Sequence, residues 1–340
     1  MSMQEAWLYQ KTDQGYVICN TCQWHCNIAT GKSGVCKVYC NQGGRLYNLN
    51  YAKISSMAVD PIEKKPLFHF HPGTLCFSIG SWGCNFHCLG CQNWQIACPS
   101  DEEPWRYSEE LNPQRGVDMA LRSNCAGIAW TYNEPGIWLE YTLDSAKLAK
   151  QKGLYTVYVT NGYSTEEALD TIGPYLDAWR VDIKGFSDHA YKNLAKVSQW
   201  QGILEVAKRA KQKWQMHLEV VTNLVPGIND DEQQLKDIAA WIKSELGEEV
   251  PWHVTRFHPN RLLQDTPPTP VVTIEHAVSI GKSKGLKYVY AGNLPGNEDE
   301  NTVCPSCGKR TIKRYSYQVD LSGLKGISCR YCGTALNIVR

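Results

Sequence analysis

Three cysteines with the spacing Cys84-x3-Cys88-x2-Cys91 form a candidate set of metal ligands on one short segment. A cubane iron–sulfur cluster normally takes four protein thiolates. Three thiolates on one tight loop would leave one iron atom open to a substrate or cofactor. The alternative is a zinc site completed by His87 or by a distant residue, and the spacing favours the cluster.

A second group lies near the end of the chain and consists of two C-x2-C pairs, Cys304 with Cys307 and Cys329 with Cys332. Each pair is followed by glycine, which resembles the paired knuckles of a zinc ribbon. Four thiolates at this spacing predict a closed, tetrahedral structural site. Zinc is favoured over a rubredoxin-like iron site, although both metals accept four thiolates.

A third group lies near the N-terminus and contains Cys19, Cys22, Cys26, Cys36 and Cys40. The first four are enough for a zinc ion or for a second iron–sulfur cluster. Structural zinc is the simpler interpretation, because closed four-thiolate sites most often hold together small, loop-rich lobes. Cys40 has no assigned role.

The remaining cysteines, Cys76, Cys98 and Cys125, stand apart and are interpreted as small buried hydrophobic residues. The first 14 residues show no export signal, so we expect a cytoplasmic protein. In a reducing compartment cysteines bind metals more often than they form disulfides.

The composition excludes several classes of protein. Among the 340 residues, 35 Lys and Arg balance 34 Asp and Glu, which makes nucleic acid an unlikely partner and argues against a basic membrane-surface binder. Hydrophobic residues make up 43%, too many for a disordered chain. The uncharged stretch 66–100 is rich in His, Gly, Asn and Gln, so we do not expect it to cross a membrane.

Strands and helices that alternate along the chain must position these ligands. Seven runs have the length and composition of strands, and they cover residues 75–79, 127–130, 155–160, 179–183, 217–222, 253–257 and 288–290. Helical patterns cover 137–150, 235–246 and about 273–284. This alternation predicts an α/β fold with parallel βαβ units, either a barrel or an open sheet.

Polar residues follow several of these strands, where an α/β barrel places its chemistry. Glu134 follows the second strand and Asn161 the third, Asp182 and Lys184 lie at the end of the fourth, and His258 follows the sixth. Each has a simpler interpretation. Asn161 could belong to a plain turn, Asp182 and Lys184 could pair with each other, and His258 could be an ordinary loop residue.

The Cys84, Cys88, Cys91 motif is the signature of the radical S-adenosylmethionine (radical SAM) superfamily, which the sequence resembles beyond the motif. The resemblance implies a partial (β/α)6-type barrel and a [4Fe-4S] cluster. It also implies that the open iron is chelated by S-adenosylmethionine, whose reductive cleavage gives a 5′-deoxyadenosyl radical.

The same resemblance suggests roles for the polar residues. The segment containing Asn133 and Glu134 occupies the place of the superfamily's Gly-Gly-Glu-Pro segment, which receives the methionyl amine. Asn161, Asp182 and Lys184 resemble residues of glycyl-radical activating enzymes that lie near the ribose and the methionyl carboxylate. His258 is a further candidate for cofactor binding.

One position departs from the superfamily pattern. The residue before the third cysteine is usually an aromatic that packs against the adenine, but here it is Gly90. Phe86 or Trp94 is the candidate to fill that space.

A closer resemblance is to the radical SAM member of the AmmeMemoRadiSam system, which is similar to pyruvate formate-lyase activating enzymes. It extends from about Cys19 to Cys332 and rests on the N-terminal cysteines and on segments 54–67, 82–85, 91–94, 132–135 and 290–293. The resemblance implies Memo-like and AMMECR-like proteins as partners. It also implies an external electron donor of the flavodoxin or ferredoxin type.

Together these observations predict four parts: a Cys-rich lobe at 1–50, a linking segment at 51–74, a radical SAM barrel at 75–298 and a zinc-ribbon-like module at 299–340. The predicted function is hydrogen abstraction from an unidentified substrate, with a glycyl-radical activase as one form. The alternative is a non-catalytic zinc or iron–sulfur module that docks protein partners or RNA.

Overall fold

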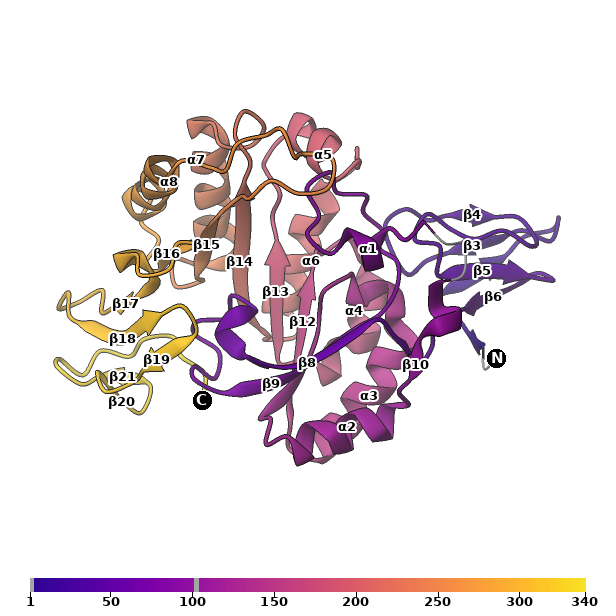
Figure 1. Cartoon of the computed structure of the whole chain (residues 1–340), viewed down its shortest axis with the longest axis horizontal. Helices are drawn as coiled ribbons and strands as arrows, with labels where there is room; N and C mark the ends of the chain where they lie inside the picture. Colours follow the sequence, from indigo (N-terminus) through magenta and orange to yellow (C-terminus); the bar gives the residue numbers. More distant parts are fainter. Residues whose placement is uncertain (1–2, 101–103) are drawn as a thin grey trace. The chain divides into compact units, whose positions relative to one another are not determined.

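The computed structural model describes residues 3–100 and 104–340 (Figure 1). The chain divides into two compact units, each built from three segments. The first unit contains Met1–Asp60, Leu75–Trp179 and Gln199–Met216, and the second contains Pro61–Thr74, Arg180–Ser198 and His217–Arg340.

The first unit is built on parallel strands. Strand β11 (Gly127–Trp130) pairs in parallel with both β9 (Leu75–Gly80) and β12 (Tyr155–Thr160), and Gly127 lies opposite Cys76 on one side and Tyr155 on the other. β11 and β12 have the predicted bounds, and β9 is one residue longer. Next to β9 runs β8 (Ser56–Pro61), a strand that no sequence pattern predicted.

Four longer helices belong to this unit: α2 (Pro113–Arg122), α3 (Leu139–Gln151), α4 (Glu166–Ile172) and α6 (Gln201–Gln212). α3 packs on β11 and β12, which explains why all four residues of β11 are buried. The predicted helix at 137–150 is divided into a 3-10 turn at Pro135–Trp138 and α3.

Local sequence signals explain where two of these helices begin. The Asn112 side chain accepts a hydrogen bond from the Arg115 backbone N–H, and Pro113 occupies the first turn of α2. Thr165 caps α4 in the same way by accepting from Ala168 N–H. Such caps satisfy backbone donors that have no partner within the helix.

The N-terminal lobe also belongs to the first unit and consists of short antiparallel strands. One sheet has the order β2-β3-β4 and the other β1-β6-β5. Their bounds are β1 (Gln4–Glu5), β2 (Tyr9–Lys11), β3 (Val17–Cys19), β4 (Asn27–Ile28), β5 (Tyr39–Gln42) and β6 (Arg45–Asn48). Farther along, β7 (Lys53–Ile54) pairs with β10 (Glu109–Glu110).

Glu140 of α3 connects this lobe to the helix layer. Its carboxylate is fully buried and accepts hydrogen bonds from Tyr39 Oη at 2.8 Å, Asn48 Nδ2 at 2.9 Å and the Trp7 backbone N–H at 3.3 Å. Burial raises the pKa of Glu140 above its ordinary value, while the hydrogen bonds from Asn48 and Tyr39 oppose that change.

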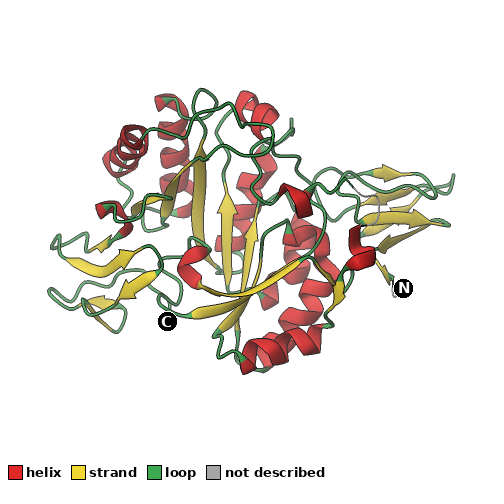
Figure 2. Ribbon diagram, viewed as in Figure 1, coloured by secondary structure: helices red, strands yellow, loops and turns green. Residues whose placement is uncertain are grey.

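The second unit has its own parallel strands. β15 (Trp252–Arg256) pairs with β14 (His217–Leu224) and β16 (Val289–Gly292), and α8 (Val271–Ser283) packs on β15 and β16 (Figure 2). α5 (Asp188–Leu194) and α7 (Glu232–Trp241) complete its helices. The predicted helix at 235–246 starts earlier because Asp231 caps α7, and it ends in a π-helical turn at Ile242–Leu246.

The C-terminal residues of the second unit form small antiparallel sheets: β17 (Thr302–Val303) with β18 (Arg310–Tyr315) and β19 (Gln318–Asp320), and β20 (Leu324–Lys325) with β21 (Ser328–Cys329). Strand β13 (Ala178–Asp182) is divided between the two units at Trp179.

A buried polar network stabilises the second unit. Glu219 of β14 is fully buried and accepts from the Phe68 and His69 backbone N–H groups at 3.0 and 2.8 Å, and it pairs with His253 Nε2 at 2.6 Å and His217 Nε2 at 2.9 Å. Burial alone would raise the pKa of Glu219, but hydrogen bonds and charge from the two histidines lower it.

The predicted fold class is confirmed: the protein has an α/β fold with parallel strands and a cysteine cluster near the C-terminus. The described strands form no closed barrel, which agrees with the predicted partial barrel. Among the described helices, none has the length and apolar composition needed to cross a membrane.

Candidate iron–sulfur and metal sites

Cys84, Cys88 and Cys91 lie on the loop that joins β9 to the short helix α1 (Trp94–Ala97). The loop begins where β9 ends, at the carboxyl edge of the parallel strands, as predicted. All three cysteines are half-buried. Burial, followed by the charge of Glu134, raises the pKa of the Cys84 thiol well above its ordinary value.

Gly83 shows how tightly this loop is packed. Its φ of +82° favours glycine, and a Cβ atom there would lie 2.5 Å from the Cys36 carbonyl oxygen and 2.7 Å from Val38 Cγ2. The loop therefore contacts the N-terminal lobe directly at the residue before Cys84.

Asparagine side chains bind the backbone of the loop. Asn133 accepts from the Ser81 N–H at 3.1 Å and donates to the Gly83 carbonyl at 2.9 Å. Asn50 Nδ2 donates to Ser81 Oγ at 2.7 Å and to a loop carbonyl at 3.0 Å, and Asn93 Nδ2 donates to the Tyr132 carbonyl at 2.8 Å. Sequence reasoning missed Asn50 and Asn93, since nothing in their local pattern indicates these contacts.

Glu134 joins the ends of two strands near the same loop. Its carboxylate is buried and accepts hydrogen bonds from Gly136 N–H at 2.8 Å, Thr160 Oγ1 at 2.7 Å and Asn161 N–H at 2.8 Å. The Asn161 side chain in turn donates to Asn85 Oδ1 at 2.8 Å and lies 3.8 Å from Cys84 Sγ. The first unit thus brings together Cys84, Asn133, Glu134 and Asn161, which lie up to 77 residues apart in the sequence.

The other predicted cofactor-binding residues belong to the second unit. Asp182 pairs with Lys184 Nζ at 2.7 Å, which is the contact that the simpler interpretation of this segment expects. It also pairs with Arg180, which no sequence pattern predicted. Burial would raise the pKa of Asp182, but the charges of Arg180 and Lys184 lower it below its ordinary value. His258 is exposed in the loop after β15.

The two aromatic candidates for packing the adenine differ in exposure. Phe86 is 2% exposed, and its ring centre lies 5.3 Å from that of Tyr163, so it belongs to the protein interior. Trp94 is 39% exposed at the start of α1 and leaves its ring accessible.

At the C-terminus, the four cysteines form a compact group. Cys304 Sγ lies 3.6 Å from Cys332 Sγ, Cys307 Sγ lies 3.7 Å from Cys329 Sγ, and all four sulfurs lie within 4.8 Å of one another. Tetrahedral bonds of about 2.3 Å from zinc place thiolates about 3.8 Å apart. The predicted four-thiolate site is therefore arranged to hold a single metal ion.

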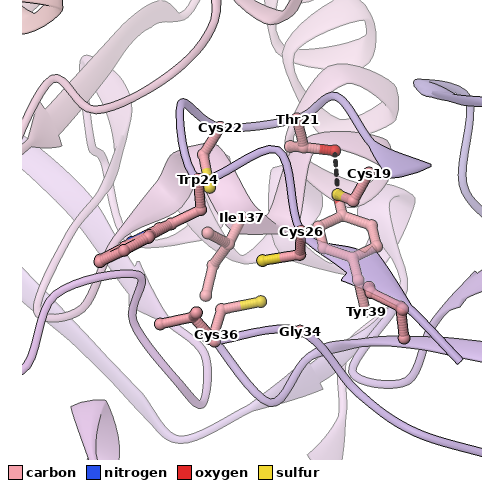
Figure 3. A pocket seen from close by; sticks show the side chains of 11 residues that line it. Cys19, Thr21, Cys22, Trp24, Cys26, Gly34, Cys36, Tyr39 and Ile137 are labelled. Carbon is pink, nitrogen blue, oxygen red and sulfur yellow. Dashed lines mark hydrogen bonds between the residues drawn. The ribbon is translucent and has the colours of Figure 1, made fainter. Parts of the chain in front are cut away.

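Four cysteines of the N-terminal lobe, unlike the compact C-terminal group, line a cavity. They are Cys19, Cys22, Cys26 and Cys36 (Figure 3). Cys40 is buried outside its lining, with Sγ 3.8 Å from the Asn41 carbonyl.

The three isolated cysteines behave differently. Cys76 and Cys125 are buried, as predicted. The prediction is wrong for Cys98, which is only half-buried, and its Sγ lies 3.5 Å from His87 Nδ1 and 3.8 Å from the Phe86 carbonyl. The contact occurs because Cys98 follows α1, which folds back on the loop that carries His87.

Comparison with known proteins gives a consistent result. The model of the radical SAM superfamily matches residues 79–242. An uncharacterized protein of Methanocaldococcus jannaschii is 43% identical over 340 residues, covering 99% of this chain and 100% of that protein. A second protein of that organism, provisionally named a glycyl-radical enzyme activating enzyme, is 24% identical over 215 residues, which are 62% of this chain and 76% of that protein.

Among solved structures, a domain of pyruvate-formate lyase-activating enzyme from Bacteroides vulgatus is 19% identical. It has a TM-score of 0.43 and covers 49% of this chain and 99% of that domain.

Proposed function

This chain belongs to the radical SAM superfamily, and we propose that it is an enzyme that reductively cleaves S-adenosylmethionine and abstracts hydrogen from a substrate. The observation that best supports this proposal is that three cysteines, Cys84, Cys88 and Cys91, lie on one loop at the carboxyl edge of the parallel strands. Three thiolates suit a [4Fe-4S] cluster with one open iron position.

Cys84, Cys88 and Cys91 would hold the cluster, which would supply the electron for reductive cleavage of S-adenosylmethionine and so the means of hydrogen abstraction. The protein's own residues bind, orient and shield these groups. Asn133 and Gly83 set the path of the loop, and Asn161 directs an amide N–H toward Cys84 Sγ. Glu134 orients Asn161 through its backbone N–H.

Further contacts to S-adenosylmethionine form part of the proposal. Asn133 and Glu134 are assigned to the methionyl amine, and Asn161, Asp182, Lys184 and His258 to the remainder of the molecule. Trp94 is assigned to the adenine, because its exposed ring is available for stacking whereas Phe86 is enclosed.

The proposed substrate class is a glycyl site on a partner protein. The name of the second archaeal relative supports this class, as does the resemblance to activating enzymes in the segments around Asn161 and Asp182. We further propose membership of the AmmeMemoRadiSam system. Memo-like and AMMECR-like partners, a flavodoxin or ferredoxin-like electron donor and a cytoplasmic location follow from that assignment.

We also propose zinc for Cys304, Cys307, Cys329 and Cys332, which the sulfur spacing of 3.6 and 3.7 Å supports. The proposed division of the chain into a lobe at 1–50, a link at 51–74, a barrel at 75–298 and a terminal module at 299–340 rests on the cysteine groups and strand pattern.

A non-catalytic metal-binding module is the alternative, and the superfamily match does not favour it. Such a module needs neither an open iron position nor the network that holds the Cys84 loop. The alternative predicts no turnover of S-adenosylmethionine under any reducing condition.

The decisive experiment is anaerobic incubation of reduced, cluster-loaded protein with S-adenosylmethionine. We expect 5′-deoxyadenosine from the wild type and none from Cys84→Ala. Cys125→Ala, which changes a buried cysteine outside all three groups, should retain activity. Absence of 5′-deoxyadenosine from loaded wild type, or equal product from Cys84→Ala, would overturn the proposal.

A further inference from the structure

The cavity in the N-terminal lobe has the donor set of a metal site. Cys19, Cys22, Cys26 and Cys36 line it together with largely apolar groups, among them Trp24. Cys19, Cys22 and Cys36 are each less than 8% exposed. Four thiols from separate points of a small lobe, gathered around one cavity, are the ligands that zinc and iron–sulfur clusters take.

The spacing of the sulfur atoms separates these two occupants. A single zinc ion draws four thiolates to about 3.8 Å from one another. In a cubane cluster each thiolate binds a different iron atom, so the sulfurs lie farther apart. The distances between sulfur atoms therefore distinguish a lobe that holds a cluster from a compact four-thiolate group such as the C-terminal one.

Among the described residues, only the C-terminal group has three or more ligand atoms that all lie within 4.8 Å of one another. No three of the lobe's sulfurs meet that limit, although the four line one cavity. The sulfurs of Cys84, Cys88 and Cys91, which are expected to hold a cubane, do not all lie within that limit either. In this respect the lobe resembles the cluster loop and differs from the compact C-terminal group.

Gly34 keeps room beside one of the ligands. A Cβ atom at this position would lie 3.3 Å from Cys26 Sγ and 3.3 Å from Ile28 Cδ1. A side chain there would crowd the thiol and the cavity wall.

We propose that Cys19, Cys22, Cys26 and Cys36 bind a second [4Fe-4S] cluster. With four protein thiolates this cluster has no open iron position, so it does not bind S-adenosylmethionine. The sequence alone favoured zinc at this site, and the sulfur positions reverse that preference.

The second cluster would lie beside the first. Cys36 contacts Gly83, the residue before Cys84, through its carbonyl oxygen. Trp24, which lines the cavity, donates from Nε1 to the Asn85 carbonyl at 2.7 Å, directly after Cys84. Two paramagnetic clusters on either side of these contacts must interact magnetically when both are reduced.

The test removes the first cluster and asks whether iron remains. The full-length variant Cys84→Ala/Cys88→Ala/Cys91→Ala, reconstituted anaerobically, should hold about four iron atoms per chain and wild type about eight. The reduced variant should give one unsplit electron paramagnetic resonance signal, whereas reduced wild type should give a spectrum broadened by coupling. A triple variant without iron, or with a second zinc ion per chain, would overturn the proposal.

A reciprocal pair of variants locates the cluster. Cys22→Ala/Cys26→Ala should lose about half of the iron and the coupling, while Cys40→Ala, which alters the lobe cysteine outside the cavity, should keep both. Unchanged iron in the double variant would contradict the proposal. The triple-variant test does not depend on 5′-deoxyadenosine formation, so the second cluster can be present even if the proposed activity fails.

Discussion

Single residues control the shape of the loop that carries Cys84. Gly83 combines a left-handed backbone conformation with contacts that leave no space for a side chain, and Asn161 supplies an amide N–H to the sulfur of Cys84. These two features affect separate properties, stability and redox potential, and can be tested separately.

Gly83→Ala should lower both stability and cluster occupancy. The positive φ alone costs about 1 kcal/mol for alanine, and overlap with the Cys36 carbonyl and Val38 adds about 1–3 kcal/mol. The measurements are urea unfolding and iron content. Gly153→Ala is the matched control, because Gly153 has a φ of +74° and a Cβ atom there would meet no other atom within 4 Å. This variant should lose only the stability that the strained backbone conformation costs. Equal losses in both variants would refute the packing explanation.

Asn161→Asp should make the reduction potential of the Cys84 cluster more negative. The substitution replaces an amide donor 3.8 Å from Cys84 Sγ by a carboxylate, and hydrogen bonds and charge near cluster sulfurs set the potential. A redox titration followed by electron paramagnetic resonance measures the shift, with Asn193→Asp on α5 as the control, because Asn193 bonds only within its own helix segment and not to the Cys84 loop. A potential equal to that of wild type would show that Asn161 does not act on the cluster.

At the scale of elements, buried polar groups connect helices and strands in each unit. Glu140 of α3 binds three groups of the N-terminal lobe, and Glu219 of β14 binds the segment around His69. Removing one partner of such a group leaves buried donors without acceptors, which costs more than the bond itself contributes.

Glu140→Ala should destabilise the lobe by about 3 kcal/mol, because Tyr39 and Asn48 would keep buried donors without partners. Hydrogen exchange of residues 3–50 measures the local opening. Glu140→Gln, which keeps an acceptor, should lose less, and the exposed Glu205→Ala should change nothing. If hydrogen exchange in the lobe were the same in Glu140→Ala and in the wild type, the hydrogen bonds of Glu140 would not stabilise the lobe.

The segment around His69 should make the second unit sensitive to acid. Burial is the main reason why the pKa of His69 is lowered from 6.5 to about 3. The charge of Glu219 opposes this change, whereas the charges of Arg314 and His217 add to it. Between these values the unfolded chain binds a proton that the folded chain does not. The stability contribution is therefore complete above pH 6.5 and is lost as the pH falls toward 3.

Urea unfolding at several pH values measures this effect. Between pH 6 and 5, His69→Gln should remove up to about 1.4 kcal/mol per pH unit from the wild-type slope. The exposed His276→Gln should keep the wild-type slope. A His69→Gln slope identical to that of the wild type would rule out His69 as the titrating group.

At the scale of the whole molecule, the cysteine groups proposed to bind metal belong to separate parts of the chain. Cys304 and Cys329 belong to a small core with Ile312, Leu324 and Leu336, and Cys307 packs against it. Arg314 of the same module is buried, lies 4.1 Å from the Phe68 ring centre and donates to the Phe68 carbonyl at 2.7 Å. Loss of the metal should therefore affect the strands of the second unit as well as the module.

A zinc chelator should remove about one zinc ion per chain and unfold the C-terminal module, since structural zinc contributes on the order of 10 kcal/mol to such folds. Hydrogen exchange should then rise across residues 302–339 and near Phe68, while the iron absorption of the Cys84 loop is unchanged. A red, zinc-free protein would instead indicate a rubredoxin-like iron site.

Much of the fold was predictable because it is encoded locally. Strands β11 and β12 are short apolar runs bounded by turn residues, and their predicted bounds match the structure. The lobe strands and β8 were missed, because runs of two to six residues with mixed burial carry no clear periodicity. Asn50 and Asn93 were missed since their contacts join residues 31 and 39 positions apart.

The sequence by itself determined the chemistry that is available: three cysteine groups, one of them with three members, and the order of the strands that precede the polar residues. Only the tertiary structure decided how these groups are arranged. It brought the C-terminal sulfurs to 3.6 and 3.7 Å, left the lobe's sulfurs spread around a cavity and set Cys36 against Gly83. The physical reason is that spacing along the chain limits which thiols can meet, whereas long-range packing sets the distances that select an ion or a cluster.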